Sequence, residues 1–223
     1  MGKPAFDPTK VNTILFDLDG TLIDTYEPIA ESWRYTVKTL TGRDISDEEI
    51  RGTLGEMLLD SMVRVMTEIE PEKALDIYRE YQRRIFLDHI KPYENVEEVL
   101  RALHERGYKS AVLTSRLRTS TERALEHFGL TGYFDAVLTA SDTKIFKPDP
   151  ALVYLILDML GSKPEEAVIV GDTAHDIEAG LASGVFTVLV DWSCALPPEK
   201  RADAPAPDAV IENMSGLLTL LNI

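Results

Sequence analysis

An apolar run that breaks into acidic residues and a glycine decides the fold of this chain: Phe16-Asp17-Leu18-Asp19-Gly20-Thr21-Leu22-Ile23-Asp24. The residues that lead into it, Thr13 to Phe16, are β-branched or apolar, which is typical of a strand covered on both faces. Asp17 and Asp19 are two positions apart, so both side chains point to one side of the strand's end. Gly20 permits the backbone to turn away from the sheet. Such an edge of a parallel sheet is where α/β proteins bind ligands.

Strand-like and helix-like segments alternate along the second half of the chain. Strands are expected at 110–114, 136–139, 167–170 and 186–190, with an edge strand at 209–211. Helices are expected at 96–106, 120–128, 150–160, 177–183 and 215–221, with a surface loop at 202–207. Alternation at these spacings predicts parallel strands joined by right-handed crossovers. The expected fold class is therefore α/β, with a doubly wound, Rossmann-like parallel sheet.

A helical pattern replaces this alternation between residues 26 and 89. Apolar residues recur there at three- and four-residue steps, which predicts helices with one apolar face. Helices are expected at 26–41, after a capping box formed by Ser46 and Glu49, at 58–69, and from Pro71 onward. An all-helical insert directly after the first strand predicts a small separate domain at 25–90, while 1–24 and 91–223 form the α/β core domain.

Composition and charge restrict the possible partners. The chain has 223 residues, 44% of them hydrophobic, and a formal net charge of −15. A polyanion would be repelled over most of such a surface, so neither nucleic acid nor an anionic membrane is expected as a partner. No apolar run approaches the roughly 20 residues of a spanning helix, and residues 1–10 contain no apolar signal-peptide core. The expected compartment is the cytoplasm; the oligomeric state is left open.

Polar residues also follow three of the later strands. Thr114 and Ser115 end one strand, Lys147 precedes Pro-x-Pro at the start of a helix, and Asp172 and Asp176 follow another strand. Taken singly, these residues have structural alternatives: the hydroxyls and acids can cap helices, and the lysine can be solvated. Together they lie at or just after strand ends that meet at one edge, which favours a shared site.

The ordered set resembles the four signatures of the haloacid dehalogenase superfamily over residues 12–192. The matching elements are Asp-x-Asp-Gly-Thr-Leu-x-Asp, then a threonine, then a lysine before Pro-x-Pro, then Gly-Asp-x-x-x-Asp. One departure is Phe146, which stands where the family often has a glycine. The helical insert is similar to the family's first cap class. The resemblance implies a phosphatase that acts through an aspartyl-phosphate, similar to phosphoglycolate phosphatases.

The resemblance also implies a role for each motif residue. Asp17 would be the nucleophile and Asp19 the general acid and base. Thr114 and Lys147 would stabilise the transferring phosphoryl group, which the backbone at Gly20, Thr21 and Ser115 would help to bind. The cofactor would be Mg²⁺, with the ligands Asp17, Asp19 through its backbone carbonyl, Asp172 and Asp176.

The substrate class implied is a small phosphorylated metabolite. The motif residues contact only the phosphoryl group, so selectivity is expected from the insert, where Arg51 is a candidate for binding a substrate carboxylate or a second phosphate. Because Arg51 is followed by Gly52, the alternative of a helix-to-helix turn with a solvated arginine stays open. The other candidate activities are pyrophosphate hydrolysis and a β-phosphoglucomutase-like phosphomutase. A non-catalytic binding module is disfavoured because it needs no pair of acids such as Asp17 and Asp19.

Overall fold

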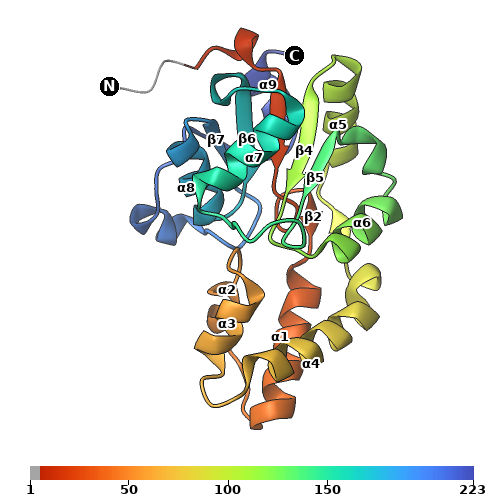
Figure 1. The fold of residues 1–223 in the computed structure, drawn as a ribbon, viewed down its shortest axis with the longest axis vertical. Coiled ribbons are helices and arrows are strands. Elements are labelled where there is room, and N and C mark those ends of the chain that lie inside the picture. Colours follow the sequence, from red (N-terminus) through yellow and green to blue (C-terminus); the bar gives the residue numbers. More distant parts are fainter. Residues whose placement is uncertain (1–5) are drawn as a thin grey trace.

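The computed structural model describes residues 6–223 and contains a six-stranded parallel sheet with helices on both faces (Figure 1). The strand order is β5-β4-β1-β6-β7-β8, which places β1 at Thr13–Phe16 between β4 and β6. The other strands are β4 (Lys109–Leu113), β5 (Ala136–Leu138), β6 (Ala167–Gly171), β7 (Phe186–Val190) and β8 (Ala209–Ile211). The expected doubly wound α/β sheet is confirmed. Residues 1–5 of the predicted core segment 1–24 lie outside the described chain.

Alternate residues of the strands pack on opposite faces of the sheet. Ile14 and Phe16 belong to one apolar cluster with residues of α5, α6 and α9 on one face. Leu15 faces the other way, into a cluster with α7 and α8. The bounds are α5 Val96–Glu105, α6 Arg118–His127, α7 Pro150–Leu160, α8 Ala174–Ser183 and α9 Gly216–Leu221. Because β1 is covered on both faces, all four of its residues are buried, which explains its continuous apolar sequence.

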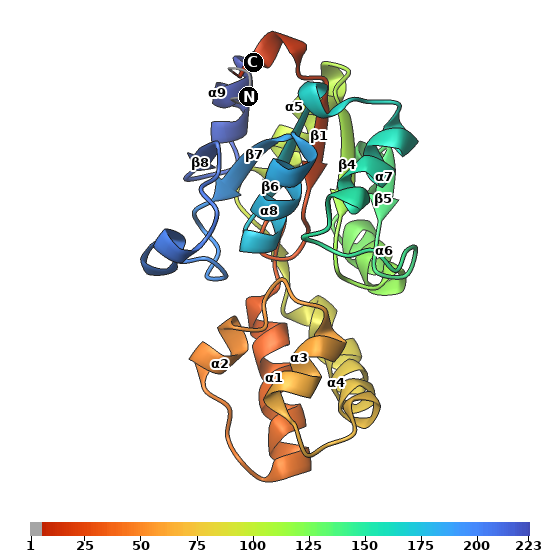
Figure 2. The same cartoon turned by 60° about the vertical axis from the view of Figure 1, so that its left-hand side comes forward.

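Four helices form a separate layer beside the carboxyl edge of the sheet, below it in Figures 1 and 2, and are called the helical insert. They are α1 (Tyr26–Thr41), α2 (Asp47–Arg51), α3 (Leu58–Val65) and α4 (Pro71–Ile85). The insert has its own apolar cluster, in which Trp33 of α1 meets Tyr78 of α4 edge to face, with ring centroids 5.5 Å apart. The chain enters and leaves it through a short antiparallel pair, β2 (Ile23–Asp24) and β3 (Lys91–Pro92).

Several segments differ from the sequence-based expectation. The helix predicted at 58–69 ends at Val65, because Met66 leaves the helical conformation. Helix α8 begins at Ala174, three residues earlier than predicted, because Thr173 and Asp176 form a capping box. Part of the expected loop near residue 202 is a 3₁₀-helix, Pro198–Asp203. Among residues 6–223, no helix is long and apolar enough to cross a bilayer.

Candidate active site

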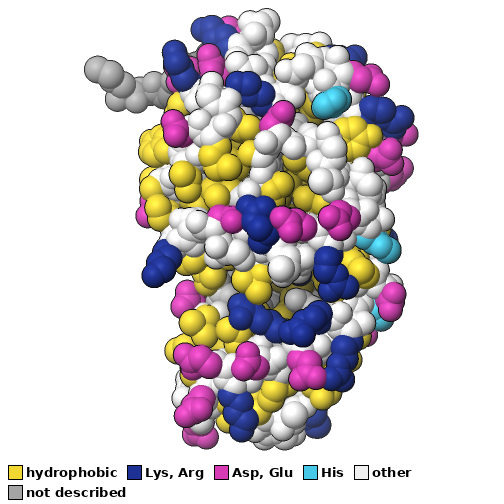
Figure 3. Space-filling model, turned by 45° about the vertical axis from the view of Figure 1, so that its right-hand side comes forward, with side chains coloured by type: hydrophobic (Ala, Val, Ile, Leu, Met, Phe, Trp, Pro, Cys, Tyr) yellow, Lys and Arg dark blue, Asp and Glu magenta, His cyan; other side chains and the backbone are white. Residues whose placement is uncertain are grey.

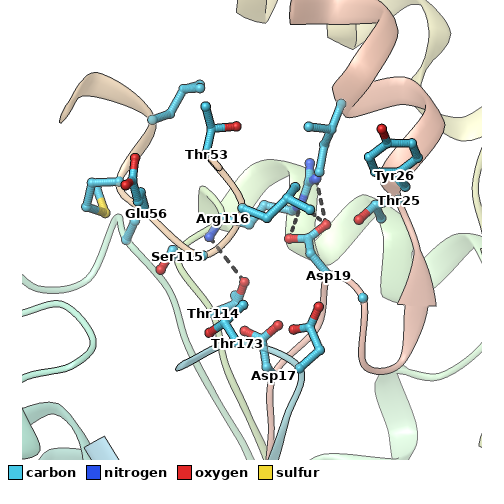
Figure 4. A pocket seen from close by; sticks show the side chains of 18 of the residues that line it. Asp17, Asp19, Thr25, Tyr26, Thr53, Glu56, Thr114, Ser115, Arg116 and Thr173 are labelled. Carbon is cyan, nitrogen blue, oxygen red and sulfur yellow. Dashed lines mark hydrogen bonds and ion pairs between the residues drawn. The ribbon is translucent and has the colours of Figure 1, made fainter. Parts of the chain in front are cut away.

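The carboxyl ends of three adjacent strands bring the predicted residues together. Asp17 follows β1, Thr114 follows β4 and Asp172 follows β6, and Figure 4 shows Asp17 and Thr114 close to Thr173 at this edge. Gly20 has a φ of +80°, and a Cβ there would lie 2.0 Å from the carboxylate of Asp172. This position therefore requires glycine both for its backbone conformation and for the close approach of the acid.

Three buried aspartates form the centre of the site. Carboxylate oxygens of Asp17, Asp172 and Asp176 all lie within 4.8 Å of one another. Lys147 Nζ donates a hydrogen bond of 2.6 Å to Asp17 and another of 2.6 Å to Asp176, and its side chain is only 3% exposed. When all four groups are ionised, three negative charges face one positive charge in a buried place.

This imbalance changes the proton affinities of the group. Burial, with the charges of Asp176 and Asp19, raises the pKa of Asp17 to about 7 even though Lys147 opposes the shift. Burial and the neighbouring Asp17 and Asp176 likewise raise the pKa of Asp172. Burial disfavours the charge of Lys147, but the two aspartates it contacts raise its pKa above the usual value. Hard oxygen donors with an excess of negative charge fit a divalent cation.

Neighbouring hydroxyls hold the aspartates in position. Thr173 donates its hydroxyl to Asp176 over 2.6 Å, and its backbone N–H donates to the same carboxylate over 3.0 Å. Ser193 donates to Asp172 over 2.5 Å, and the buried Thr21 hydroxyl lies 3.5 Å from the other oxygen of that carboxylate. The acids are therefore fixed by the core before any ligand binds, which reduces the reorganisation needed on binding.

Asp19 lines the same cavity as Asp17 and pairs with an arginine that the sequence analysis did not identify. Arg116 donates three hydrogen bonds to the Asp19 carboxylate from Nε and Nη2, at 2.7 to 3.1 Å (Figure 4). The guanidinium carbon lies 4.2 Å from the ring centroid of Phe86, the first residue after α4. The Arg116 side chain, which is 8% exposed, therefore connects the acid to the exit of the helical insert.

A cavity of about 200 Å³ lies between the sheet edge and the helical insert. The core side includes Asp17, Asp19, Gly20, Thr114, Ser115, Arg116, Lys147, Asp172 and Ser193. The insert side includes the segment 53–59, with Ile29 and Trp33 of α1 and Tyr78, Arg79 and Gln82 of α4. A Cβ at Gly55 would lie 2.8 Å from the Thr173 side chain, so this segment of the insert touches the core beside the acids.

The structure brings most of the predicted site residues to this cavity, with three exceptions. Thr21 and Asp176 are buried behind the cavity surface, where they contact Asp172 and Lys147. Arg51 is exposed and outside the cavity lining, with its guanidinium 5.8 Å from the ring centroid of Tyr26. The sequence analysis missed two lining residues, Arg116 and Ser193, which lie within three residues of the ends of β4 and β7. A search for polar residues that extended three positions beyond each strand would have found them.

Comparison with known proteins gives a consistent result. A family model described as haloacid dehalogenase-like hydrolase matches residues 14–190. A protein named pyrophosphatase PpaX from Bacillus cereus is 35% identical over 213 residues, covering 96% of this chain and 97% of the relative. The PpaX of Halalkalibacterium halodurans is 34% identical over 217 residues, covering 96% of this chain and 98% of the relative. A crystal structure of a predicted phosphatase from Clostridium acetobutylicum has a TM-score of 0.83 at 26% identity, covering 96% of this chain and 99% of that one.

Proposed function

The chain belongs to the haloacid dehalogenase-like hydrolase family and is an enzyme, and from this premise we propose that it is a Mg²⁺-dependent phosphatase acting on a small phosphorylated metabolite. The observation that carries the proposal is the position of Asp17. Its carboxylate lines the cavity, lies 2.6 Å from Lys147 Nζ and is adjacent to both Asp172 and Asp176. A nucleophile, a fixed cation and a set of oxygen donors therefore meet at one wall.

The proposed reaction has two steps. First, a carboxylate oxygen of Asp17 bonds to phosphorus as the bond to the leaving oxygen breaks, and Asp19 gives that oxygen a proton. Asp19 then takes a proton from a water molecule whose oxygen bonds to phosphorus, and this releases phosphate and restores Asp17. Thr114, the Ser115 N–H and Lys147 bind the phosphoryl oxygens and stabilise their charge throughout, which is the main requirement of phosphoryl transfer.

The metal proposed for this site is Mg²⁺, held by Asp17, Asp172 and the backbone carbonyl of Asp19, with Asp176 as a further ligand or as support for one. When bound, the ion would neutralise the excess negative charge and orient the phosphoryl group. Three buried carboxylates, of which only Asp17 and Asp176 contact Lys147, support a divalent cation at this place. The proposed compartment is the cytoplasm, where small phosphorylated metabolites are made and consumed.

Pyrophosphate is a second candidate substrate. It is favoured by the name of relatives that are 34% to 35% identical to this chain over nearly its whole length. Both candidates require the same attack by Asp17 and differ only in the leaving group, which is a phosphate in one case and an alcohol in the other. A β-phosphoglucomutase from Clostridium difficile shares the fold at 20% identity, which favours no mutase activity here.

Purified protein should be tested against pyrophosphate and a panel of phosphate monoesters, with release of inorganic phosphate as the measurement. We expect hydrolysis with Mg²⁺, loss of activity in EDTA and no activity with Ca²⁺, whose longer bonds and looser coordination misplace the phosphoryl group. The matched control is Asp17→Asn, which is nearly isosteric but cannot attack phosphorus. Full activity in excess chelator, or more than a few per cent of wild-type activity in the variant, would refute the proposal.

A further inference from the structure

Three cationic side chains line the cavity within residues 6–223, and only two of them have an anionic partner. Lys147 contacts Asp17 and Asp176, and Arg116 is paired with Asp19. Arg79, which comes from α4 of the helical insert, makes no side-chain hydrogen bond or ion pair to any described residue. It is the one cation of this cavity in residues 6–223 that is free to bind an anion from outside the protein.

The place of Arg79 makes this lack of a partner costly. Its side chain is half-buried, and burial lowers its pKa although the charge of Asp76 opposes the shift. A desolvated charge without a partner disfavours the folded state, and a bound anion would offset that cost. Surface arginines reach water freely and have no such need. The site of Arg79 therefore has the properties of a binding position rather than of a solvated surface.

The surroundings hold Arg79 in place and add a second polar group. Tyr78, the preceding residue, is buried against Trp33 and anchors this part of α4 in the insert's core. Gln82 lies three residues after Arg79, so both are on one side of the helix, and both line the cavity. Gln82 donates its amide to the Tyr78 hydroxyl over 3.0 Å, which fixes the side chain beside the arginine. Figure 3 shows Lys and Arg side chains gathered on the part of the insert nearest the core.

We propose that Arg79, with Gln82 beside it, forms a subsite in the helical insert that binds a second anionic group of the substrate, either a carboxylate or a phosphate. The inference rests on the proposed function, since Asp17 at the other wall of the same cavity would receive the phosphoryl group. The substrate class is then a small molecule with a phosphoryl group at one end and another anion at the other. Arg79 takes the part that the sequence analysis assigned to the exposed Arg51.

The volume of the cavity limits the size of such a molecule. The insert also lines the cavity with apolar side chains, including Ile29, Leu54 and Leu58, which offer no partner to a polar linker. The whole cavity measures about 200 Å³, so we expect a small molecule to occupy it. Pyrophosphate and a phosphorylated hydroxy acid with a two-carbon skeleton both satisfy this limit, and both carry the required second anion.

The test compares Arg79→Gln with a matched control, Arg83→Gln, which removes an exposed arginine of the same helix that does not line the cavity. Steady-state kinetics would be measured for pyrophosphate, phosphoglycolate and ethyl phosphate, the last having no second anion. For the preferred substrate with two anionic ends, we expect Arg79→Gln to lower kcat/KM by about 10- to 100-fold, which is the effect of losing a hydrogen bond from a charged group. For ethyl phosphate, kcat/KM should change by less than about twofold. Arg83→Gln should change none of them. The substrate that loses most identifies the second anion as phosphate or carboxylate.

A binding measurement separates this subsite from the proposed hydrolysis. Calorimetry with Mg²⁺ would compare methylenediphosphonate, which has two anionic ends and is not hydrolysed, with methylphosphonate, which has one. If Arg79→Gln weakens the binding of the diphosphonate and not that of methylphosphonate, the subsite is supported. This holds even if no substrate is hydrolysed, because absence of hydrolysis would reject only the proposed function. Equal binding of the diphosphonate by wild type and variant, together with equal kinetic losses on all three substrates, would overturn the subsite. Arg79→Lys should restore part of the affinity, because it keeps the charge without the planar guanidinium.

Discussion

At the scale of single residues, the two acids of the first motif have different environments. Asp17 lies among carboxylates and Lys147, where burial raises its pKa to about 7. Within residues 6–223, the Asp19 carboxylate, two residues later, accepts hydrogen bonds from one side chain, the guanidinium of Arg116. The first environment suits a group that a cation must keep ionised for attack. The second fixes the direction of the carboxylate that we propose as the proton donor to the leaving group.

The first prediction concerns Arg116 as a positioning residue for Asp19. In Arg116→Gln, kcat/KM for an alkyl phosphate should fall by about 100-fold, the lower range for loss of general acid catalysis. For p-nitrophenyl phosphate it should fall only a few-fold, because nitrophenolate leaves without a proton. Arg116→Lys should recover part of the difference, since it keeps the charge but not the bidentate geometry. Equal losses on both substrates, with unchanged thermal stability, would assign Arg116 to another role.

Residue by residue, local sequence predicted the positions that one strand controls and missed those that depend on distant contacts. Asp17, Thr114 and Asp172 were found because each directly follows an apolar strand. Arg79 could not be found in this way, since it is one of several arginines on a polar helix, and only the packing of α4 turns it toward the cavity. Which arginine faces the cavity depends on long-range packing and cannot be predicted from helical periodicity.

At the scale of elements, the segment after α2 closes the cavity over the acids. Thr53, Leu54, Gly55, Glu56 and Met57 line it, and Gly55 packs against Thr173 of the core with a φ of +83°. Arg64 Nη2 donates a hydrogen bond of 2.7 Å to the Glu56 carboxylate and so fixes this side chain. The contact between Gly55 and Thr173 therefore joins the insert to the residue that caps α8 and supports Asp176.

The second prediction tests this contact with two glycine variants. Gly42→Ala and Gly55→Ala both place a side chain at positive φ, so each should lower the free energy of unfolding by about 1 to 2 kcal/mol. Only Gly55→Ala also meets Thr173, at 2.8 Å, whereas Gly42 has nothing within 4 Å. Gly55→Ala should therefore raise KM several-fold while Gly42→Ala leaves it unchanged. Similar KM values in both variants would show that closure tolerates displacement of this segment.

Some element boundaries could be predicted from sequence patterns and others could not. The helices α1 and α7 were predicted at their observed positions, since each ends at a glycine in the left-handed conformation, Gly42 and Gly161. The pair β2 and β3 was not predicted, because two residues are too few to show an alternation. Its existence depends on two segments that are far apart in sequence meeting at the entrance to the insert.

At the scale of the whole molecule, the acid cluster should make the free energy of unfolding depend on pH and, with the proposed metal, on Mg²⁺. The Asp17 pKa is raised in the folded state from the usual 3.8 to about 7, so the folded protein binds more protons than the unfolded chain between these values. The contribution of Asp17 to the free energy of unfolding is therefore fully present at low pH and is lost as the pH rises toward 7. Asp142 has the opposite effect on the pH dependence of stability, because hydrogen bonds from Arg118 lower its pKa to about 2. Its contribution to stability is lost as the pH falls below about 4, outside the range in which Asp17 titrates.

The third prediction follows from that sign. In EDTA, the melting temperature should fall as the pH is raised from about 5 to 8, and Mg²⁺ should reduce the fall by neutralising the aspartates. Asp17→Asn is the matched control, because it removes one acid of the cluster, and its melting temperature in EDTA should depend less steeply on pH. A wild-type curve that is flat in EDTA, or equally steep with and without Mg²⁺, would contradict the electrostatic description of the site.

The central claim is that Asp17 carries the phosphoryl group between substrate and water, and the stereochemical course at phosphorus tests it most directly. Each in-line displacement inverts the configuration, so two successive displacements restore it. The measurement is the configuration of the inorganic thiophosphate released with Mg²⁺ from a chiral phosphorothioate monoester. The two non-bridging oxygens of this ester are different isotopes, and the hydrolysis is run in water labelled with the third isotope. Net retention is the result that attack by Asp17 predicts. Net inversion would mean that water attacks the substrate directly, and would contradict the account.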